Sequence, residues 1–93
     1  MTLHAQAPRV SLVTIDPLGE VPVYLQLAAI LRDRIRSGEL AVGRPLPSLV
    51  TLMQTYEISR GTASRATALL ITEGLARSVP GKGIFVIAKR APK

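Results

Sequence analysis

Two short runs in the second half of the chain combine hydroxyl, guanidinium and ammonium groups with glycine. The first is Ser59-Arg-Gly-Thr62, followed closely by Ser64 and Arg65, and the second is Gly81-Lys-Gly83. An arginine can bond guanine through two hydrogen bonds, hydroxyls reach phosphates or base edges, and a lysine contributes charge near phosphate. The residue types in both runs are those that contact nucleic acid.

Catalytic and metal-binding groups are scarce. The 93 residues include no cysteine, one histidine (His4) and six scattered carboxylates, so no nucleophile-base or acid-base pair is indicated. The Gly81-Lys-Gly83 run differs from a nucleotide-binding loop because β-prone residues, rather than a helix, follow it. A core of this size also cannot enclose a deep substrate chamber. We therefore expect neither an enzyme nor a cofactor.

Composition also bears on the compartment. The lack of cysteine favours the cytoplasm, and the apolar stretches are far shorter than the roughly 20 residues that a membrane span requires. We expect a cytoplasmic protein without a membrane partner.

The charge is distributed unevenly. The first 57 residues hold five basic and five acidic groups, whereas the last 36 hold seven basic groups and one acidic group. The whole net charge of +6 therefore lies in the last part of the chain. Such asymmetry is typical of a face that binds a polyanion. A basic tail for solubility would explain residues 89–93 well, but explains Arg60, Arg65 and Lys82 less well.

The elements that must position these groups are predicted from apolar spacing and capping residues. A helix of about four turns has Pro22 as its first residue and ends at Gly38. Its apolar residues recur at three- and four-residue spacings: Val23, Leu27, Ile30, Leu31 and Ile35. The run Gly43-Arg-Pro-Leu-Pro47 that follows is predicted to be a rigid loop.

Two further helices are separated by a short break at Glu57 and Ile58. Ser48 caps the first of them, which runs through Tyr56, and Ser59 caps the second, over about residues 59–73. The inward stripe of the second is predicted to contain Ala63, Ala66, Thr67, Leu70 and Ile71. Together these two elements predict a helix-turn-helix.

A β-hairpin is predicted after Gly74. The stretches Leu75–Val79 and Ile84–Ala88 are β-prone, and Pro80-Gly-Lys-Gly83 joins them with glycines that can adopt positive φ. The order of the elements predicts a mainly α fold with a small β-hairpin: a winged helix-turn-helix with three helices and a two-stranded wing.

Three segments are predicted along the chain. Residues 1–15 form a partly disordered N-terminal arm, within which Val10–Ile15 indicates a short strand or an extended segment. Residues 16–88 form the winged-helix domain, beginning with a turn over Asp16–Gly19. Residues 89–93 form a basic tail or the start of a linker.

An ordered set of motifs points to a known family. It comprises Pro22-Val-Tyr-Leu-Gln-Leu-Ala28, Gly38-Glu-Leu40, Leu46-Pro-Ser48, Ile58-Ser-Arg60, Thr62, Glu73-Gly-Leu75 and Gly81-Lys-Gly83. With these motifs at these spacings, the chain resembles the winged-helix DNA-binding domain of the GntR transcriptional regulators over about residues 16–88.

The resemblance implies sequence-specific binding of double-stranded DNA by a bacterial regulator. Most members of this family are repressors that bind palindromic operators as dimers. Their third helix, here about residues 59–73, lies in the major groove, and their wing, here about residues 75–88, lies on the minor groove or the backbone.

Individual roles are carried over at the positions that match. Ser59, Arg60 and Thr62 fall on DNA-contacting positions at the start of the third helix. The wing tip is matched by three residues, namely Gly81, Lys82 and Gly83.

The chain departs from the family pattern at two places. After Thr62 the family usually has Val-Arg, whereas this chain has Ala63-Ser64, with Arg65 one position further on and rotated by about 100° around the helix. Ser64 and Arg65 remain candidate DNA contacts, and Arg65 either reaches a phosphate from the flank or only faces solvent. After Ser48, the usual glutamate and the variable position are replaced by Leu49-Val50, so the usual capping carboxylate and a possible contact are missing. Because of the changes after Thr62, base specificity is expected to differ from that of the commonest family operators.

Other polar and aromatic residues are interpreted structurally. Tyr24 and Tyr56 are expected to pack against helix faces. Arg32, Arg34 and Arg36 are expected to form a solvated helix face.

Partners follow from the same resemblance. We expect any homodimer of this chain to be weak and to become stronger on DNA. A small-molecule effector would act only through a C-terminal domain that this chain lacks, so the chain is either an isolated domain or a minimal regulator. The alternative functions are a winged-helix protein-docking module and an RNA-binding domain, although three aromatic residues offer little stacking surface for unpaired bases.

Overall fold

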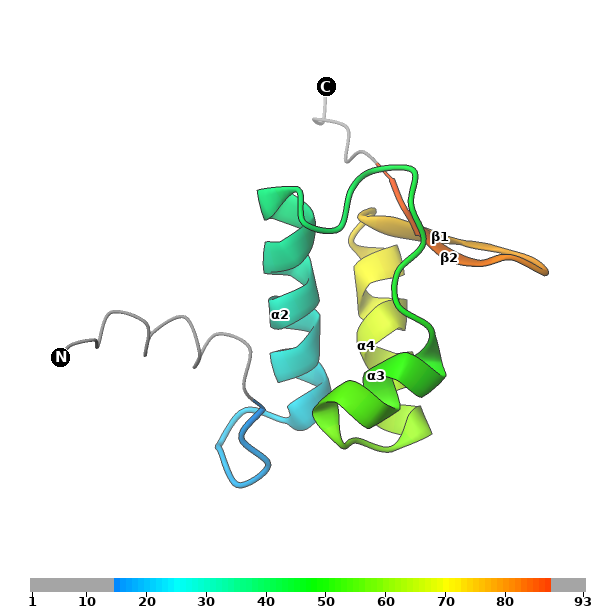
Figure 1. Cartoon of the computed structure of the whole chain (residues 1–93). Coiled ribbons are helices and arrows are strands. Elements are labelled where there is room, and N and C mark those ends of the chain that lie inside the picture. The colour runs from blue at the N-terminus through cyan, green and yellow to red at the C-terminus, as the bar shows by residue number, and fades with distance from the viewer. Residues whose placement is uncertain (1–14, 88–93) are drawn as a thin grey trace, which may run out of the picture.

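A computed structural model describes residues 15–87 and shows three helices followed by a two-stranded hairpin (Figure 1). The elements are α2 (Val23–Ser37), α3 (Leu49–Tyr56), α4 (Arg60–Thr72), β1 (Ala76–Val79) and β2 (Gly83–Val86). The hairpin projects away from the three helices. The predicted winged helix-turn-helix is therefore confirmed. The predicted N-terminal arm lies almost wholly, and the basic tail entirely, outside the described residues.

Helix α2 begins one residue later than predicted. Pro22 is its N-cap rather than its first helical residue, because a ψ of 144° keeps Pro22 extended. Its carbonyl oxygen still accepts hydrogen bonds from the backbone N–H groups of Leu25 and Gln26, at 3.0 and 3.1 Å. The predicted end of the helix at Gly38 is confirmed, with the Gly38 N–H donating to the Ile35 carbonyl at 3.1 Å.

The predicted turn before α2 is also present. The backbone N–H of Leu18 donates to Asp16 Oδ1 at 3.0 Å, and that of Gly19 donates to the Asp16 carbonyl at 3.1 Å. The Gln26 side chain ties this turn to α2. Gln26 Oε1 accepts from the Asp16 N–H at 2.7 Å, and Nε2 donates to the carbonyls of Asp16 and Val21 at 2.8 and 2.7 Å.

Both predicted serine caps are formed. Ser48 Oγ accepts a hydrogen bond from the backbone N–H of Thr51, and Ser59 Oγ accepts one from that of Thr62, each at 3.1 Å. Between the two helices, Glu57 adopts the left-handed conformation with a φ of 57° and ends α3. The predicted helix-turn-helix is thereby built from two capped helices.

The core surrounds α4, which contacts α2, α3 and β1. Ala63, Ala66, Thr67 and Leu70 are buried on the inward face of α4, as the apolar pattern predicts, whereas Ile71 is only half-buried. Leu27 and Leu31 of α2, Leu52 of α3 and Val86 of β2 complete the set of fully buried large side chains. The side chains of the two buried alanines are small, so α4 can lie close to the neighbouring helices.

The wing is an antiparallel pair in which Val79 faces Gly83 at the closed end. The Lys82 N–H donates to the Val79 carbonyl at 2.9 Å, and Gly81 and Gly83 have φ angles of 77° and 119°. Side chains with a Cβ rarely adopt such angles, so glycine allows the three-residue loop to close. Both strands differ from the prediction: Leu75 lies outside β1, and β2 begins one residue earlier, at Gly83, and ends at Val86. Residue 88 lies outside the described range.

The segment predicted to be only a rigid loop also pairs with the wing. The Gly43 N–H donates to the Val86 carbonyl at 2.8 Å, the Val86 N–H to the Arg44 carbonyl at 2.9 Å, and the Leu46 N–H to the Ile84 carbonyl at 2.7 Å. This segment runs along β2 on the side away from β1 (Figure 1). The prolines of this segment lack N–H groups, but they do not interrupt the pairing because the donors within the segment are Gly43 and Leu46.

The prediction that the arginine face of α2 is simply solvated is wrong for Arg32 and Arg34. Arg32 Nε and Nη2 donate to Glu73 Oε1 and Oε2 at 2.9 and 2.7 Å, linking α2 to the end of α4. The hydrogen bond to Glu73 raises the pKa of Arg32 most; burial lowers the pKa by less, and the negative charges of Glu73 and Asp33 raise it further. The Arg32 guanidinium therefore links α2 to the C-terminal end of α4 by an ion pair.

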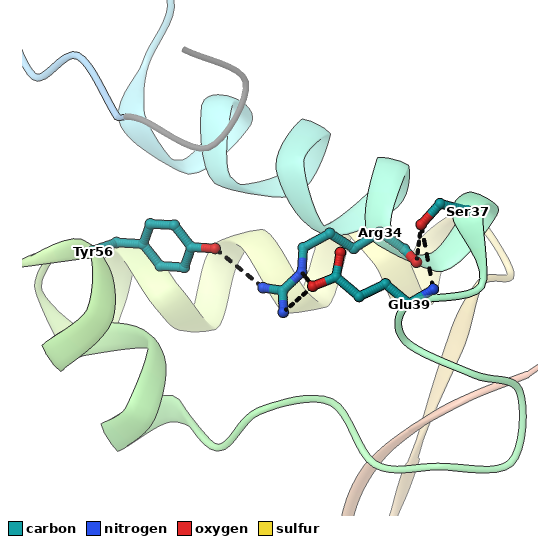
Figure 2. A network of polar contacts seen from close by, with 4 residues as sticks. All are labelled: Arg34, Ser37, Glu39 and Tyr56. Carbon is teal, nitrogen blue, oxygen red and sulfur yellow. Dashed lines mark hydrogen bonds and ion pairs between the residues drawn. The ribbon is translucent and has the colours of Figure 1, made fainter. Parts of the chain in front are cut away.

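Arg34 makes a second structural network at the end of α2 (Figure 2). Its guanidinium donates to Glu39 Oε2 at 3.0 Å and to the Tyr56 hydroxyl at 3.2 Å. Ser37 Oγ donates to the Arg34 carbonyl at 3.1 Å and accepts from the Glu39 N–H at 3.3 Å. The network joins the turn after α2 to α3. Tyr56 is half-buried against the core, as predicted, and its hydroxyl has this additional polar role.

We predict that Arg32→Ala lowers the free energy of unfolding by about 1 kcal/mol, the upper end for exposed pairs, because a two-bonded and only partly exposed ion pair is lost. The side chains of Arg32 and Glu73 are 23% and 29% exposed. Urea denaturation followed by circular dichroism measures the change. Arg36→Ala, at an exposed arginine in the last turn of the same helix, is the matched control and should change stability little. Equal losses in the two variants would contradict the structural role of Arg32.

Candidate nucleic-acid interface

Five of the eight predicted DNA-contacting residues lie in α4 or at its N-cap. Ser59, Arg60, Ser64 and Arg65 are exposed, and Thr62 is half-buried. Because an α-helix turns by about 100° per residue, Arg60 and Ser64 lie within about 40° of each other, and Arg65 lies further around the flank. The structure thus places Arg60 and Ser64 on one edge of α4 and Arg65 on its flank, with Ser59 and Thr62 at the capped start of the helix.

The cap of α4 sets the positions of Ser59 and Thr62. Besides accepting from the Thr62 N–H, Ser59 Oγ donates to Thr62 Oγ1 at 2.9 Å. The Thr62 hydroxyl accepts this bond and donates to no group within residues 15–87. Its proton is therefore available to an acceptor beyond the helix start, such as a phosphate oxygen.

Arg60 is the first residue of α4 and has no ion pair within the described part of the chain. This distinguishes it from Arg32 and Arg34, whose guanidinium groups are bonded to carboxylates. The structure therefore separates arginines that hold helices together from an exposed arginine whose charge is not neutralised. Only the second kind can offer its full set of donors to an external anion.

Arg65 is exposed and makes a contact that was not predicted from the sequence. Its Cζ atom lies 4.0 Å from the centre of the Tyr24 ring, so the guanidinium is positioned over an aromatic face. Tyr24 lies near the start of α2 and is half-buried against the core, as predicted. The stack was not predicted, because the apolar pattern assigns Tyr24 to packing and does not show which residue covers its outer surface.

The wing tip forms a second, separate group. Gly81, Lys82 and Gly83 are exposed at the outer end of the hairpin, away from the helices (Figure 1). Arg77 of β1 is also exposed, with its Cα paired with that of Phe85. The excess of positive charge after residue 57 includes Arg77, yet no motif match singled it out as a site residue. The wing therefore carries two exposed cations, Arg77 and Lys82, whereas the motif match indicated only Lys82.

Other kinds of site have little support among the described residues. No three side chains of histidine, aspartate or glutamate within residues 15–87 come together in an arrangement that could hold a metal ion. The helices in this range are also too short or too polar to cross a membrane.

Comparison with known proteins identifies the family. Residues 23–86 match the model of the bacterial regulatory proteins of the gntR family. Over 72 residues the chain is 36% identical to the HTH-type transcriptional repressor NagR of Bacillus subtilis, a match that covers 77% of this chain and 30% of NagR. The chain thus spans about a third of the length of this relative.

Solved structures show the same architecture. YtrA from Sulfolobus acidocaldarius, a GntR-family transcription factor, aligns with a TM-score of 0.76 and 28% identity, covering 85% of this chain and 83% of YtrA. The AraR DNA-binding domain in complex with operator ORX1 aligns with a TM-score of 0.71 and 33% identity, covering 80% and 92% of the two chains. These proteins are transcription regulators rather than enzymes, in agreement with the prediction from the sequence. The family match and the architecture together show that the chain belongs to the gntR family of bacterial regulatory proteins, as a winged helix-turn-helix DNA-binding domain of a transcriptional regulator.

Proposed function

We propose that this chain is the operator-reading part of a bacterial repressor that binds a palindromic site as a dimer. In this proposal α4 lies in the major groove and the wing lies on the minor groove or the backbone. The observation that carries it is the exposed Arg60 at the capped start of α4, which has no carboxylate partner within residues 15–87. The first residues of a recognition helix reach base edges, and arginine bonds guanine with two hydrogen bonds.

Each candidate residue has a role consistent with its surroundings. Arg60 reads a base, and Ser64, on the same edge of α4, adds a short polar side chain beside it. Ser59 and Thr62 offer hydroxyls at the helix start. At the wing tip, Gly81 and Gly83 let the backbone approach phosphate closely, and Lys82 adds a positive charge. Arg65 binds phosphate from the flank of α4.

Two kinds of relative support the proposal. NagR is named as a repressor, and the AraR domain was crystallised with an operator. A small-molecule effector would act only through a C-terminal domain outside this chain, and the chain alone is expected to dimerise weakly and more strongly on DNA. A cytoplasmic location accords with this role.

Selection from random duplex DNA, followed by titration of the selected duplex at several salt concentrations, tests the proposal. Enrichment of a palindrome together with a steep fall of affinity with salt would support a dimeric operator reader. Salt-sensitive binding without enrichment would show that the chain grips only the backbone. Absence of duplex binding would overturn the proposal in favour of protein docking, and preference for single-stranded RNA would favour RNA binding.

Lys82→Ala is expected to weaken binding to all duplexes by a similar factor, because a wing-tip ammonium contacts phosphate rather than a base. The slope of log affinity against log salt should fall in magnitude by about 1. Fluorescence anisotropy with the selected duplex and with a scrambled duplex measures both quantities. A loss confined to the selected duplex would contradict the phosphate role.

A further inference from the structure

The contact between Arg65 and Tyr24 joins α4 to the start of α2 on the exposed surface of the domain. The Arg65 guanidinium carbon lies 4.0 Å from the Tyr24 ring centre, which is stacking distance for a cation on an aromatic face. Tyr24 itself is anchored, since it is half-buried and packed against the core. The ring therefore provides a fixed platform for an otherwise flexible side chain.

The geometry of a guanidinium makes this platform compatible with phosphate binding. The group is planar and its five N–H bonds point outward in the plane, so a ring against its face leaves the donors at its edge free. Arg65 has no carboxylate partner within residues 15–87, whereas the guanidinium of Arg32 is hydrogen-bonded to Glu73 and its charge is neutralised there. A tyrosine ring positions Arg65 without cancelling its charge.

The position of Arg65 on the helix also matters. Arg60 and Arg65 are five residues apart, so they point about 140° away from each other around α4. When Arg60 faces the floor of a groove, Arg65 faces a wall of the groove, where the phosphates lie. The Tyr24 ring holds the guanidinium on the side of α4 that faces α2.

We propose that Tyr24 is a positioning residue for Arg65, whose stacked guanidinium uses its free edge to bind a backbone phosphate beside α4. This inference rests on the proposed function, because it requires α4 to lie in the groove of a duplex. It adds the start of α2 to the surface that determines affinity, through a residue that carries no charge. The pair contributes to affinity for every duplex and not to the choice of bases.

A double-mutant cycle tests the proposal with Tyr24→Leu, Arg65→Met, and the two combined, using the full chain and both a selected and a scrambled duplex. Met keeps the length of the arginine stem without its charge. We expect Arg65→Met to reduce the magnitude of the salt slope by about 1 and to weaken binding to both duplexes equally. Tyr24→Leu should weaken binding by about two- to fivefold, the range of a cation–aromatic contact at an exposed site.

The coupling between the two positions separates positioning from mere packing. We expect Tyr24→Leu to have no further effect once Arg65 is Met, and Tyr24→Phe, which keeps the ring, to bind like the parent. An equal loss from Tyr24→Leu with and without Arg65 would show that the ring acts only through the fold. An unchanged salt slope in Arg65→Met would overturn the phosphate contact.

Thermal denaturation followed by circular dichroism shows which variants are folded at the assay temperature. If Tyr24→Leu does not fold, the cycle is run with Tyr24→Phe and Tyr24→His, which vary the strength of the ring contact at similar volume. The proposal is supported if Tyr24→His weakens DNA binding only when Arg65 is present. Failure of the parent chain to bind any duplex would overturn the proposed function, and this inference with it. Duplex binding by the parent with uncoupled Tyr24 and Arg65 would overturn this inference alone.

Discussion

Arg60→Ala is expected to weaken binding to the selected operator by about 1 to 3 kcal/mol and to relax the base preference at one position of each half-site. Arg60 is exposed at the first position of α4, and no carboxylate within the described residues competes for its guanidinium. Truncation would therefore remove two hydrogen bonds to a base without altering a contact inside the domain. Binding titrations against a panel of single-base operator variants measure both effects.

Arg36→Ala is the matched control for the loss of one positive charge. Arg36 is also exposed, but it lies in the last turn of α2, whereas Arg60 lies in the first turn of α4. It should leave the preference among operator variants unchanged. Arg60→Lys separates charge from geometry, because lysine keeps the charge but lacks the planar fork that matches guanine. An Arg60→Ala chain that binds as tightly and as selectively as the parent would exclude base reading by this residue.

Leu70→Ala is expected to destabilise the domain by about 2 to 5 kcal/mol, because a fully buried leucine is lost and a cavity remains. Leu70 has 0% exposure on the inward face of α4, within the cluster that joins α2, α3 and the wing. Native domains have a total stability of only about 5 to 15 kcal/mol, so a loss at the upper end of the expected range would leave a domain of low stability largely unfolded at room temperature. Urea denaturation followed by circular dichroism measures the loss.

Leu18→Ala gives the same chemical change at a position that is 94% exposed. It should alter the free energy of unfolding by less than about 0.5 kcal/mol. A comparable loss in both variants would show that stability does not depend on the core around α4. Addition of operator DNA should partly restore the folded fraction of Leu70→Ala, since a ligand that binds only the folded state stabilises it.

The local elements of this domain were predictable because their signals act over a few residues. Ser48 and Ser59 cap helices through the N–H group three residues further on, and Gly38 follows the last turn of α2. The buried stripe of α4 repeats at helical spacing, so its inward face was also predictable. The candidate DNA contacts at the start of α4 and at the wing tip were implied by the resemblance to the GntR family, and the excess of positive charge agrees with them.

The long-range contacts required the tertiary structure. The pairing of Gly43–Leu46 with β2, the bond between Arg32 and Glu73, and the stack of Arg65 on Tyr24 each join segments that are distant in sequence. An arginine has the same local pattern whether it meets a carboxylate, an aromatic ring or solvent, because its partner is set by how the helices pack. The sequence by itself thus determined the helices, the wing and the location of the basic surface, whereas packing decided which arginines hold the fold together and which remain available to DNA.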